Sequence, residues 1–252
     1  MLTFASLVRR NLLHFHRTNL AVAAGVAVAA SVLTGSLLVG DSVRGSLRDL
    51  FLSRLGKTDH AVLSGGGFFR EDLAEDIAPG AAPLVVFEGA VANDRTGRRK
   101  TRVQVYGVDQ RFWQFHHAAV PELSPRGALL TESLRAELEV QEGDGLLLRV
   151  ERPSEVPRGS LHGVKEDVGR TIRLTAQPGL DSTGLPEFSI YPSQEGVTAI
   201  FVPLARLQRD LDQPARVNAV LVAGSSTDEV VAALRRSASL EDLALRVRVL
   251  EP

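Results

Sequence analysis

The sequence predicts an α+β protein, in which one N-terminal transmembrane helix with a stalk precedes a mixed α/β extracytoplasmic domain carrying a β-rich insertion. Three observations support this class. Residues 20–40 form a run without a charge. A helical apolar pattern continues over 41–56, and beyond it period-two segments and short helical segments follow in separate groups. Groups of strands and helices along one chain are typical of α+β domains.

The composition restricts the classes of function. The 252 residues carry 29 basic and 30 acidic side chains, so the net charge of −1 argues against a general nucleic-acid-binding protein. The chain has no cysteine, which excludes disulfides, thiolate zinc sites and cysteine nucleophiles. A chain of this length is expected to form one large or two small domains.

Residues 20–40 are long enough to cross a bilayer. At ~1.5 Å per residue this helix is about 31 Å long, and the hydrocarbon core is about 30 Å thick. Arg9, Arg10 and Arg17 precede the run, and the first acidic residue is Asp41. Because basic residues are held on the cytoplasmic side, the N-terminus is predicted in the cytoplasm and the main domain outside, anchored in the plasma (inner) membrane.

Residues 1–19 favour a retained helix over a cleaved signal peptide. A signal h-region is usually about 7–15 residues long and follows a short charged region. Here the apolar run is longer, and in the residues before it apolar side chains and arginines alternate at roughly helical spacing. We therefore expect a cytoplasmic amphipathic segment over 1–19. The Ala-Val-Ala-Ala stretch at 27–30 resembles a cleavage site and keeps the alternative open.

Small residues recur every four positions along the predicted membrane helix. They are Ala23, Ala27, Ser31 and Gly35, and they predict a flat helix-packing face on which another helix can approach closely. The alternative is that alanine is simply common in such helices. If the face is used, the helix belongs to a bundle of helices.

The helical pattern continues past Asp41 as a stalk over 41–56. Val43, Leu47 and Leu50 keep an apolar stripe, and Gly56 is a suitable C-terminal stop. A continuous helix from bilayer to domain could carry force, which a flexible linker could not.

The extracytoplasmic domain is predicted over 57–252, with 57–110 and 196–252 as a strand–helix subdomain and 111–195 as an inserted subdomain. Period-two and helical patterns place its elements. The predicted strands are Leu84–Asn93 and Arg102–Val108, joined as a hairpin, then Leu146–Glu151, Thr171–Ala176, Thr198–Val202, Val217–Val222 and Leu245–Leu250. The predicted helices are Arg70–Ile77, Thr131–Glu139 capped by Thr131 with Leu134 and Leu138 inward, Leu204–Leu211 begun by Pro203, and Thr227–Ser237 with Val230, Val231 and Leu234 buried.

No stretch carries the pattern of an active site. Gly56-Lys57-Thr58 resembles the end of a phosphate-binding P-loop, but the earlier glycine that this loop needs is replaced by Phe51. In 159–163 a leucine stands where a hydrolase elbow requires serine. The adjacent His116 and His117 cannot easily chelate one metal ion, and Phe112-Trp113 is expected in the core. We therefore predict no catalytic, cofactor or metal residues and no enzyme activity.

Four landmarks in sequence order resemble the MacB/FtsX-type ABC transporter permeases, in their first transmembrane helix and the extracytoplasmic core domain after it. The landmarks are Val103–Asp109 followed by Phe112-Trp113, Gly127–Leu134 leading to Glu142-Gly143-Asp144, Ala199–Leu204 with Leu207-Gln208, and Val217–Val222. The resemblance covers most of the chain.

The resemblance implies a permease component that couples ATP hydrolysis by a partner subunit to extracytoplasmic movement, in efflux or lipoprotein release. It implies a cytoplasmic ATP-binding subunit, further permease helices and a dimeric assembly as partners, in the membrane and without nucleic acid. Members of the family carry more membrane helices after this domain, so the chain is expected to be truncated or a fragment. The alternative is a single-pass, membrane-anchored binding or sensor protein without a transport role.

Overall fold

The structure is a computed structural model that describes residues 4–65, 67–151, 169–180, 185, 187–193 and 195–243. It divides into two compact units, Met1–Leu50 and Phe51–Pro252. The mixed helix and strand content confirms the predicted α+β class. Two expected features, the strand Leu245–Leu250 and the elbow-like stretch 159–163, lie outside the described residues.

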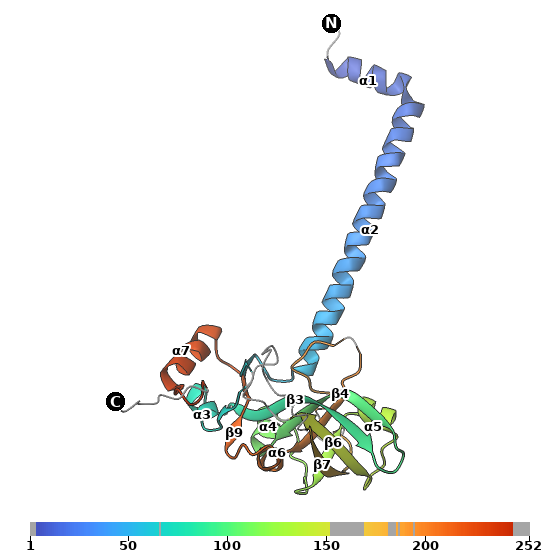
Figure 1. The fold of residues 1–252 in the computed structure, drawn as a ribbon. Coiled ribbons are helices and arrows are strands. Elements are labelled where there is room, and N and C mark those ends of the chain that lie inside the picture. The colour runs from blue at the N-terminus through green and yellow to red at the C-terminus, as the bar shows by residue number, and fades with distance from the viewer. Residues whose placement is uncertain are drawn as a thin grey trace, which may run out of the picture. The chain divides into compact units, whose positions relative to one another are not determined.

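The first unit consists of helices (Figure 1). α1 (Phe4–His14) and α2 (His16–Arg54) are separated at Phe15, and the last turn of α2 belongs to the second unit. Among the described residues α2 alone is long and apolar enough to cross a membrane, by length and composition. The predicted membrane helix and stalk therefore form one uninterrupted helix, which begins four residues earlier than predicted and ends two residues before Gly56.

The second unit is built on an extensive β-sheet. Its described strands are β1 (His60–Leu63), β2 (Phe69–Arg70), β3 (Ala82–Asn93), β4 (Arg99–Val108), β5 (Gly127–Leu130), β6 (Gly145–Glu151), β7 (Gly169–Ala176), β8 (Ala199–Pro203), β9 (Arg216–Val217) and β10 (Ala219–Val222). The sheet order is β1-β10-β3-β4-β8-β5-β7-β6, and β6 also pairs with β3. The six strands from β3 to β6 therefore close on themselves as a small barrel, and β10 and β1 extend the sheet from β3.

A bulge in β3 makes this closure possible. The register of β3 against β4 shifts between Gly89 and Val91, which bends the strand. Gly89 is paired with Val150 of β6, and a Cβ at Gly89 would lie 3.0 Å from the carbonyl oxygen of Arg149. The absence of a side chain there lets β6 approach β3 and complete the barrel.

The segment 111–195 was predicted as an inserted subdomain. Its strands β5, β6 and β7 belong to the same sheet as β4, which precedes the segment, and β8, which follows it. β4 and β8, which flank this segment, pair in parallel from Gln104↔Ala199 to Val108↔Pro203. The segment is thus an insertion between two adjacent strands and is also part of their sheet.

In the part of this unit that the structure describes, five short helices accompany the strands: α3 (Leu73–Ile77), α4 (Gln110–Phe115), α5 (Glu132–Leu138), α6 (Leu204–Asp210) and α7 (Thr227–Ser237). The two faces of the sheet carry separate apolar clusters. One contains alternate strand residues such as Val85, Val105 and Ile200, together with residues of α3, α5, α6 and α7. The other contains the intervening residues, such as Tyr106 and Phe201, with Phe112 and Trp113 of α4.

Most predicted elements are present, with local corrections. The hairpin β3–β4 is confirmed, and the helix Thr227–Ser237 has the predicted bounds. The predicted helix Arg70–Ile77 is wrong over its first three positions, because Arg70 lies in β2 and the helix begins at Leu73. The helix α4 had not been predicted.

Three side-chain predictions and one strand prediction are corrected. Val231 is 39% exposed and Leu234 is only partly buried, whereas Ala233 is buried with Val230, because these two residues lie on the side of α7 that packs on the core. Thr131 stands at the N-cap of α5 but makes no capping bond, because its Oγ1 pairs with the backbone of Ala199 in β8. The strand Val217–Val222 is interrupted at Asn218.

Candidate functional site: the clamp at the end of the long helix

The four residues of the predicted helix-packing face all lie on α2, in the first unit. Ala23, Ala27, Ser31 and Gly35 are exposed in the described chain, and a Cβ at Gly35 would meet no atom within 4 Å. The continuous helix keeps their spacing of four, so they share one side of α2. The face remains a prediction, since nothing in the described chain packs against it.

Arg54, the last residue of α2, is held by two side-chain hydrogen bonds. Arg54 donates from Nε to Glu187 Oε2 at 2.8 Å and from an Nη atom to the carbonyl oxygen of Ser193 at 2.8 Å. Its side chain is only 7% exposed, whereas that of Glu187 is 36% exposed. A guanidinium suits this place because it offers several donors in a fixed plane.

The backbone at the same helix end is also bonded. The N–H of Ser189 donates to the carbonyl oxygen of Arg54 at 3.2 Å. This carbonyl is one of those that a helix leaves without an intrahelical partner at its C-terminus. Segment 187–193 therefore holds both the side chain and the main chain of Arg54.

On its other side, segment 187–193 is fastened to β4. The hydroxyl of Ser189, fully buried, donates to Gln104 Oε1 at 2.9 Å, and the N–H of Ile190 donates to the hydroxyl of Tyr106 at 3.3 Å. Burial raises the pKa of Tyr106 above its ordinary value, so this hydroxyl stays neutral. The end of α2 and the barrel strand β4 are thus joined through one short segment.

Just after the helix the chain turns through a position that suits only glycine. Gly56 has φ +59°, and a Cβ there would lie 2.5 Å from His116 Nδ1. The following N–H, of Lys57, donates to the same Nδ1 at 3.2 Å. His116 therefore lies directly against the turn that ends α2.

His116 is held in an apolar surrounding. Its ring lies 4.7 Å from the ring of Phe112, 4.9 Å from that of Phe115 and 4.9 Å from that of Phe188, between centroids. Burial, with a smaller contribution from the charge of His117, lowers the pKa of His116 to about 4. Since Nδ1 accepts from Lys57, the neutral ring carries its proton on Nε2, which has no partner in the described chain.

Aromatic side chains connect this site to the sheet. Phe188 lies 5.1 Å from Phe112 and 5.2 Å from Tyr106, and Tyr106 stacks on Phe201 of β8 at 5.1 Å. All four rings are almost fully buried. Interiors packed in this way are stiff, so a displacement of one ring is passed to its neighbours.

We name Arg54, Gly56, His116, Glu187 and Ser189 the helix-end clamp. No group of three or more His, Asp or Glu residues that could hold a metal ion occurs in the part of the chain described. In the described chain Arg54 is bonded to Glu187 and to segment 187–193, Ser189 is bonded to Gln104, and His116 accepts from the N–H of Lys57. This arrangement can position one element against another, which is a mechanical role.

Sequence reasoning missed the clamp. The stalk pattern over 41–56 assigns no contact to Arg54, and the pair His116-His117 was considered only as a possible metal site. Glu187 is 133 residues from Arg54 along the chain, so no local pattern could have paired them. The available signal was a helix that ends on arginine two residues before a glycine, which is a common C-terminal arrangement.

Three polar residues of the sequence landmarks, Asp109, Gln208 and Asn218, hold loops or strand ends. Asp109 caps α4 by accepting from the N–H of Arg111, and Gln208 donates to Glu71 and to the carbonyl oxygen of Arg216. Asn218 bonds both the N–H and the carbonyl oxygen of Val86 at 2.7 Å, which continues the sheet where β9 and β10 are interrupted. These landmarks therefore specify the fold.

Asp144, in the second landmark, fixes the turn before β6. It accepts from Arg95 Nε at 2.8 Å and from the N–H of Gln141 at 2.8 Å. The hydrogen bond from Arg95, with that from Gln141, lowers the pKa of Asp144 to about 2. The carboxylate is therefore ionised at any ordinary pH.

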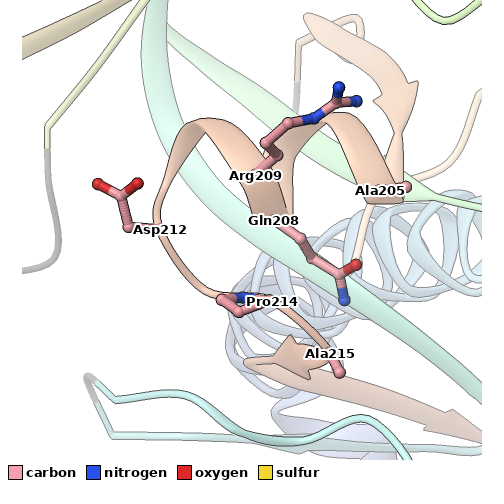
Figure 2. Close-up of a pocket in the computed structure, with 6 residues that line it drawn as sticks. All are labelled: Ala205, Gln208, Arg209, Asp212, Pro214 and Ala215. Atoms are coloured by element: carbon pink, nitrogen blue, oxygen red, sulfur yellow. The ribbon is translucent and has the colours of Figure 1, made fainter.

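A separate hollow lies beside α6 (Figure 2), lined by Ala205, Gln208, Arg209, Asp212, Pro214 and Ala215. Gln208, the polar residue at its centre, is already engaged by Glu71 and the backbone of Arg216. Figure 2 shows Arg209 and Gln208 pointing in different directions from the helix. The hollow therefore offers no convergent set of polar groups of the kind that ligand sites use.

Comparisons with known proteins give structural neighbours only. No protein-family model matches the chain, and no curated protein matches it significantly. The periplasmic region of MacB from Actinobacillus actinomycetemcomitans is similar with a TM-score of 0.40 at 10% identity, over 72% of this chain and 83% of that one. The extracellular domain of the noncanonic ABC-type transporter YknZ from Gram-positive bacteria is similar with a TM-score of 0.37 at 10% identity, over 69% and 88%.

Proposed function

We propose that this protein is a permease component of an ABC-type transporter, which couples ATP hydrolysis by a cytoplasmic partner subunit to movement outside the membrane. The proposed role is efflux or lipoprotein release. In this role α2 spans the plasma (inner) membrane with its N-terminus in the cytoplasm, and the unit Phe51–Pro252 lies outside. The partners are the ATP-binding subunit and further permease helices in a dimeric assembly, and nucleic acid is not among them.

One observation carries the proposal. The long apolar helix ends in a bonded joint: Arg54 is fixed by Glu187, Ser193 and Ser189, and Ser189 is fixed in turn to Gln104 of β4. A membrane anchor needs no such joint, because a flexible linker would hold a domain at the surface equally well. A helix that transmits displacement does need one.

The chain itself is proposed to have no enzyme activity. The energy would come from the partner subunit, which agrees with the failed P-loop pattern at 56–58, where Gly56 is the turn that ends α2 against His116. On this proposal, the DNA adjacent to the gene encodes an ATP-binding subunit and further membrane helices. Unrelated neighbouring genes would count heavily against it.

The direct test measures movement in native membranes. Because the natural chain has no cysteine, a cysteine pair at Arg48 on α2 and at the exposed Glu195 beyond segment 187–193 can be labelled specifically. We expect the distance between the labels to change when ATP and vanadate are added. The change should be reduced by Arg54→Gln and retained in the control Arg44→Gln, an exposed position on the same helix.

An unchanged distance in membranes where the ATP-binding subunit is present would overturn the proposal. That result would favour the single-pass binding or sensor protein, in which the helix serves only as an anchor.

A further inference from the structure

The first helix, α1, presents an apolar stripe that no described residue covers. Phe4, Leu7, Val8 and Leu12 recur at helical spacing on one side, and their exposed fractions are 83%, 52%, 43% and 54%. Asn11 is the polar residue on this stripe, and Leu13 lies on the opposite side. A soluble helix would bury such a stripe against a core, and here no core is available.

The other side of α1 and the turn after it are basic. Arg9 and Arg10 flank the polar side, Arg17 follows in the first turn of α2, and no acidic residue occurs before Asp41. Arginines beside an apolar stripe can extend their charged ends to a surface while their aliphatic stems stay near it. This combination of an apolar stripe and arginines fits a membrane interface, which has apolar acyl chains on one side and negatively charged headgroups on the other.

The helix axis changes direction at Phe15, as Figure 1 shows for the N-terminal end of α2. The Nδ1 atom of His16 lies 3.2 Å from the carbonyl oxygen of Leu13, which in an unbroken helix would accept from the backbone of Arg17. The side chain of His16 thus replaces a backbone bond, and α1 turns away from the line of α2.

The length of the connection matches the depth of a headgroup layer. Between Phe15 and Leu20, where the uncharged run begins, α2 has four residues, about 6 Å of helix. The interfacial layer on each side of the hydrocarbon core is about 5–7 Å thick. If residues 20–40 span the core, α1 falls at the level of the headgroups.

We propose that α1 is a docking surface for a lipid leaflet rich in anionic phospholipids, with its apolar stripe in the acyl boundary and Arg9, Arg10 and Arg17 at the phosphate groups. This inference rests on the proposed membrane placement of α2 and adds a lipid class to it. The charge of α1 favours anionic lipid over zwitterionic lipid. A zwitterionic bilayer could bury the apolar stripe, but it would leave the positive charges of the three arginines, which have no acidic neighbours in sequence, without a negative partner. An acidic groove of a partner subunit is the rival occupant.

The test places one probe on each side of α1. In the full-length protein, Leu12→Cys and Leu13→Cys are labelled with an environment-sensitive fluorophore and reconstituted into vesicles of phosphatidylcholine with and without phosphatidylglycerol. Because the two sites are adjacent leucines, they form a matched pair. We expect a blue-shifted, quencher-protected signal at residue 12 and a water-like signal at residue 13, with the difference larger when phosphatidylglycerol is present.

Arg9→Gln with Arg10→Gln should lower the ratio of docked to undocked α1 on the order of tenfold in the anionic vesicles, and added salt should do the same. The control is Arg44→Gln with Arg48→Gln, beyond the uncharged run, which should leave the signal at residue 12 unchanged.

Equal signals at residues 12 and 13 would overturn the proposal, whether α1 were unfolded or undocked. A signal at residue 12 that does not change with phosphatidylglycerol or salt would overturn the choice of anionic lipid. Protection of residue 12 that requires an added ATP-binding subunit would show instead that α1 binds an acidic groove of that subunit. None of these measurements requires transport or ATP, so their failure is distinct from failure of the proposed transport role.

Discussion

Two regions of the same helix, α2, meet opposite conditions. Along residues 20–40 no side chain is buried in the described chain, and a Cβ at Gly25, Gly35 or Gly40 would touch nothing within 4 Å. At the other end, Arg54 is almost completely buried and makes hydrogen bonds to three residues of one segment. The first region is specified by composition spread over many residues, and the second by a few individual contacts.

This difference predicts how each region responds to substitution. A composition-based region tolerates single changes, because apolar residues replace one another in lipid at little cost. The helix-end clamp does not tolerate single changes, because the loss of one group leaves its buried hydrogen-bond partner unsatisfied. Substitutions in the clamp should therefore be costly for the second unit, and substitutions along residues 20–40 should leave its stability unchanged.

The largest effect is expected for Gly56→Ala. A side chain at φ +59° costs about 1–2 kcal/mol, and the added Cβ would lie 2.5 Å from His116 Nδ1, which adds about 1–3 kcal/mol of overpacking. We expect the free energy of unfolding to fall by about 3 kcal/mol. Urea titration of the full-length protein in detergent, followed by the fluorescence of the single tryptophan, Trp113, measures it.

Gly97→Ala is the matched control for that substitution. Gly97 has φ +70°, but a Cβ there would meet nothing within 4 Å, so only the backbone cost of about 1 kcal/mol applies. Equal losses for the two variants would show that the contact between Gly56 and His116 does not constrain the helix end.

The second prediction concerns pH and His116. Its pKa in the folded protein is about 4, below the ordinary 6.5, so the unfolded chain takes up the proton first as the pH falls. Stability that is fully present above pH 6.5 is therefore lost progressively down to pH 4, by about 3 kcal/mol for a shift of this size. Protonation also turns Nδ1 into a donor that faces the N–H of Lys57.

His116→Asn separates this effect from other titrations, because the amide oxygen can accept from Lys57 but does not titrate. The difference in unfolding free energy between the natural chain and this variant should shrink between pH 6.5 and pH 4. The depressed pKa of Asp144, about 2, acts in a lower window, below its ordinary 3.8. A difference that stays constant with pH would rule out His116 as the source.

Arg54→Gln is expected to cost about 2 kcal/mol. Removal of one member of a fully buried ion pair can cost about 3–5 kcal/mol, but Glu187 is 36% exposed and water can solvate the carboxylate left behind. Arg44→Gln, an exposed position on the same helix, should change the unfolding free energy by less than about 0.5 kcal/mol. The same urea titration compares the two, and similar values would mean that the clamp contributes no stability.

Local patterns accounted for much of the fold. The helical pattern over 227–237 predicted the boundaries of α7, and alternation around a charged turn predicted the β3–β4 hairpin. In the structure a capping box, in which Ser226 and Glu229 bond each other's backbone, begins α7. In contrast, the closure of β6 on β3 depends on a bulge near Gly89, which has no local signature of its own. Helix α4 was missed because it is only six residues long and aromatic.

The candidate site was not predictable from the sequence in the same way. Each of its main contacts joins residues far apart in the chain: Arg54 with Glu187, Lys57 with His116, and Ser189 with Gln104. No local period or motif pairs these residues with one another, so the contacts appear only once the chain is folded. The small-residue face of α2 is the opposite case, because its sequence pattern is clear but no residue of the described chain packs against it.

The smallest effect on the soluble unit is expected from that face. Ala27→Leu with Gly35→Leu should leave the unfolding free energy followed by Trp113 unchanged, because both residues are exposed and belong to the first unit, whereas Trp113 belongs to the second. If another helix packs there, the bulkier side chains prevent close approach and weaken the association by about 1 kcal/mol or more. Val22→Leu, on the opposite side of the helix, is the control. Cross-linking yields in native membranes would separate the cases: loss with the paired substitution alone assigns the face to helix packing, whereas equal yields for all variants leave residues 20–40 as an anchor whose composition is sufficient.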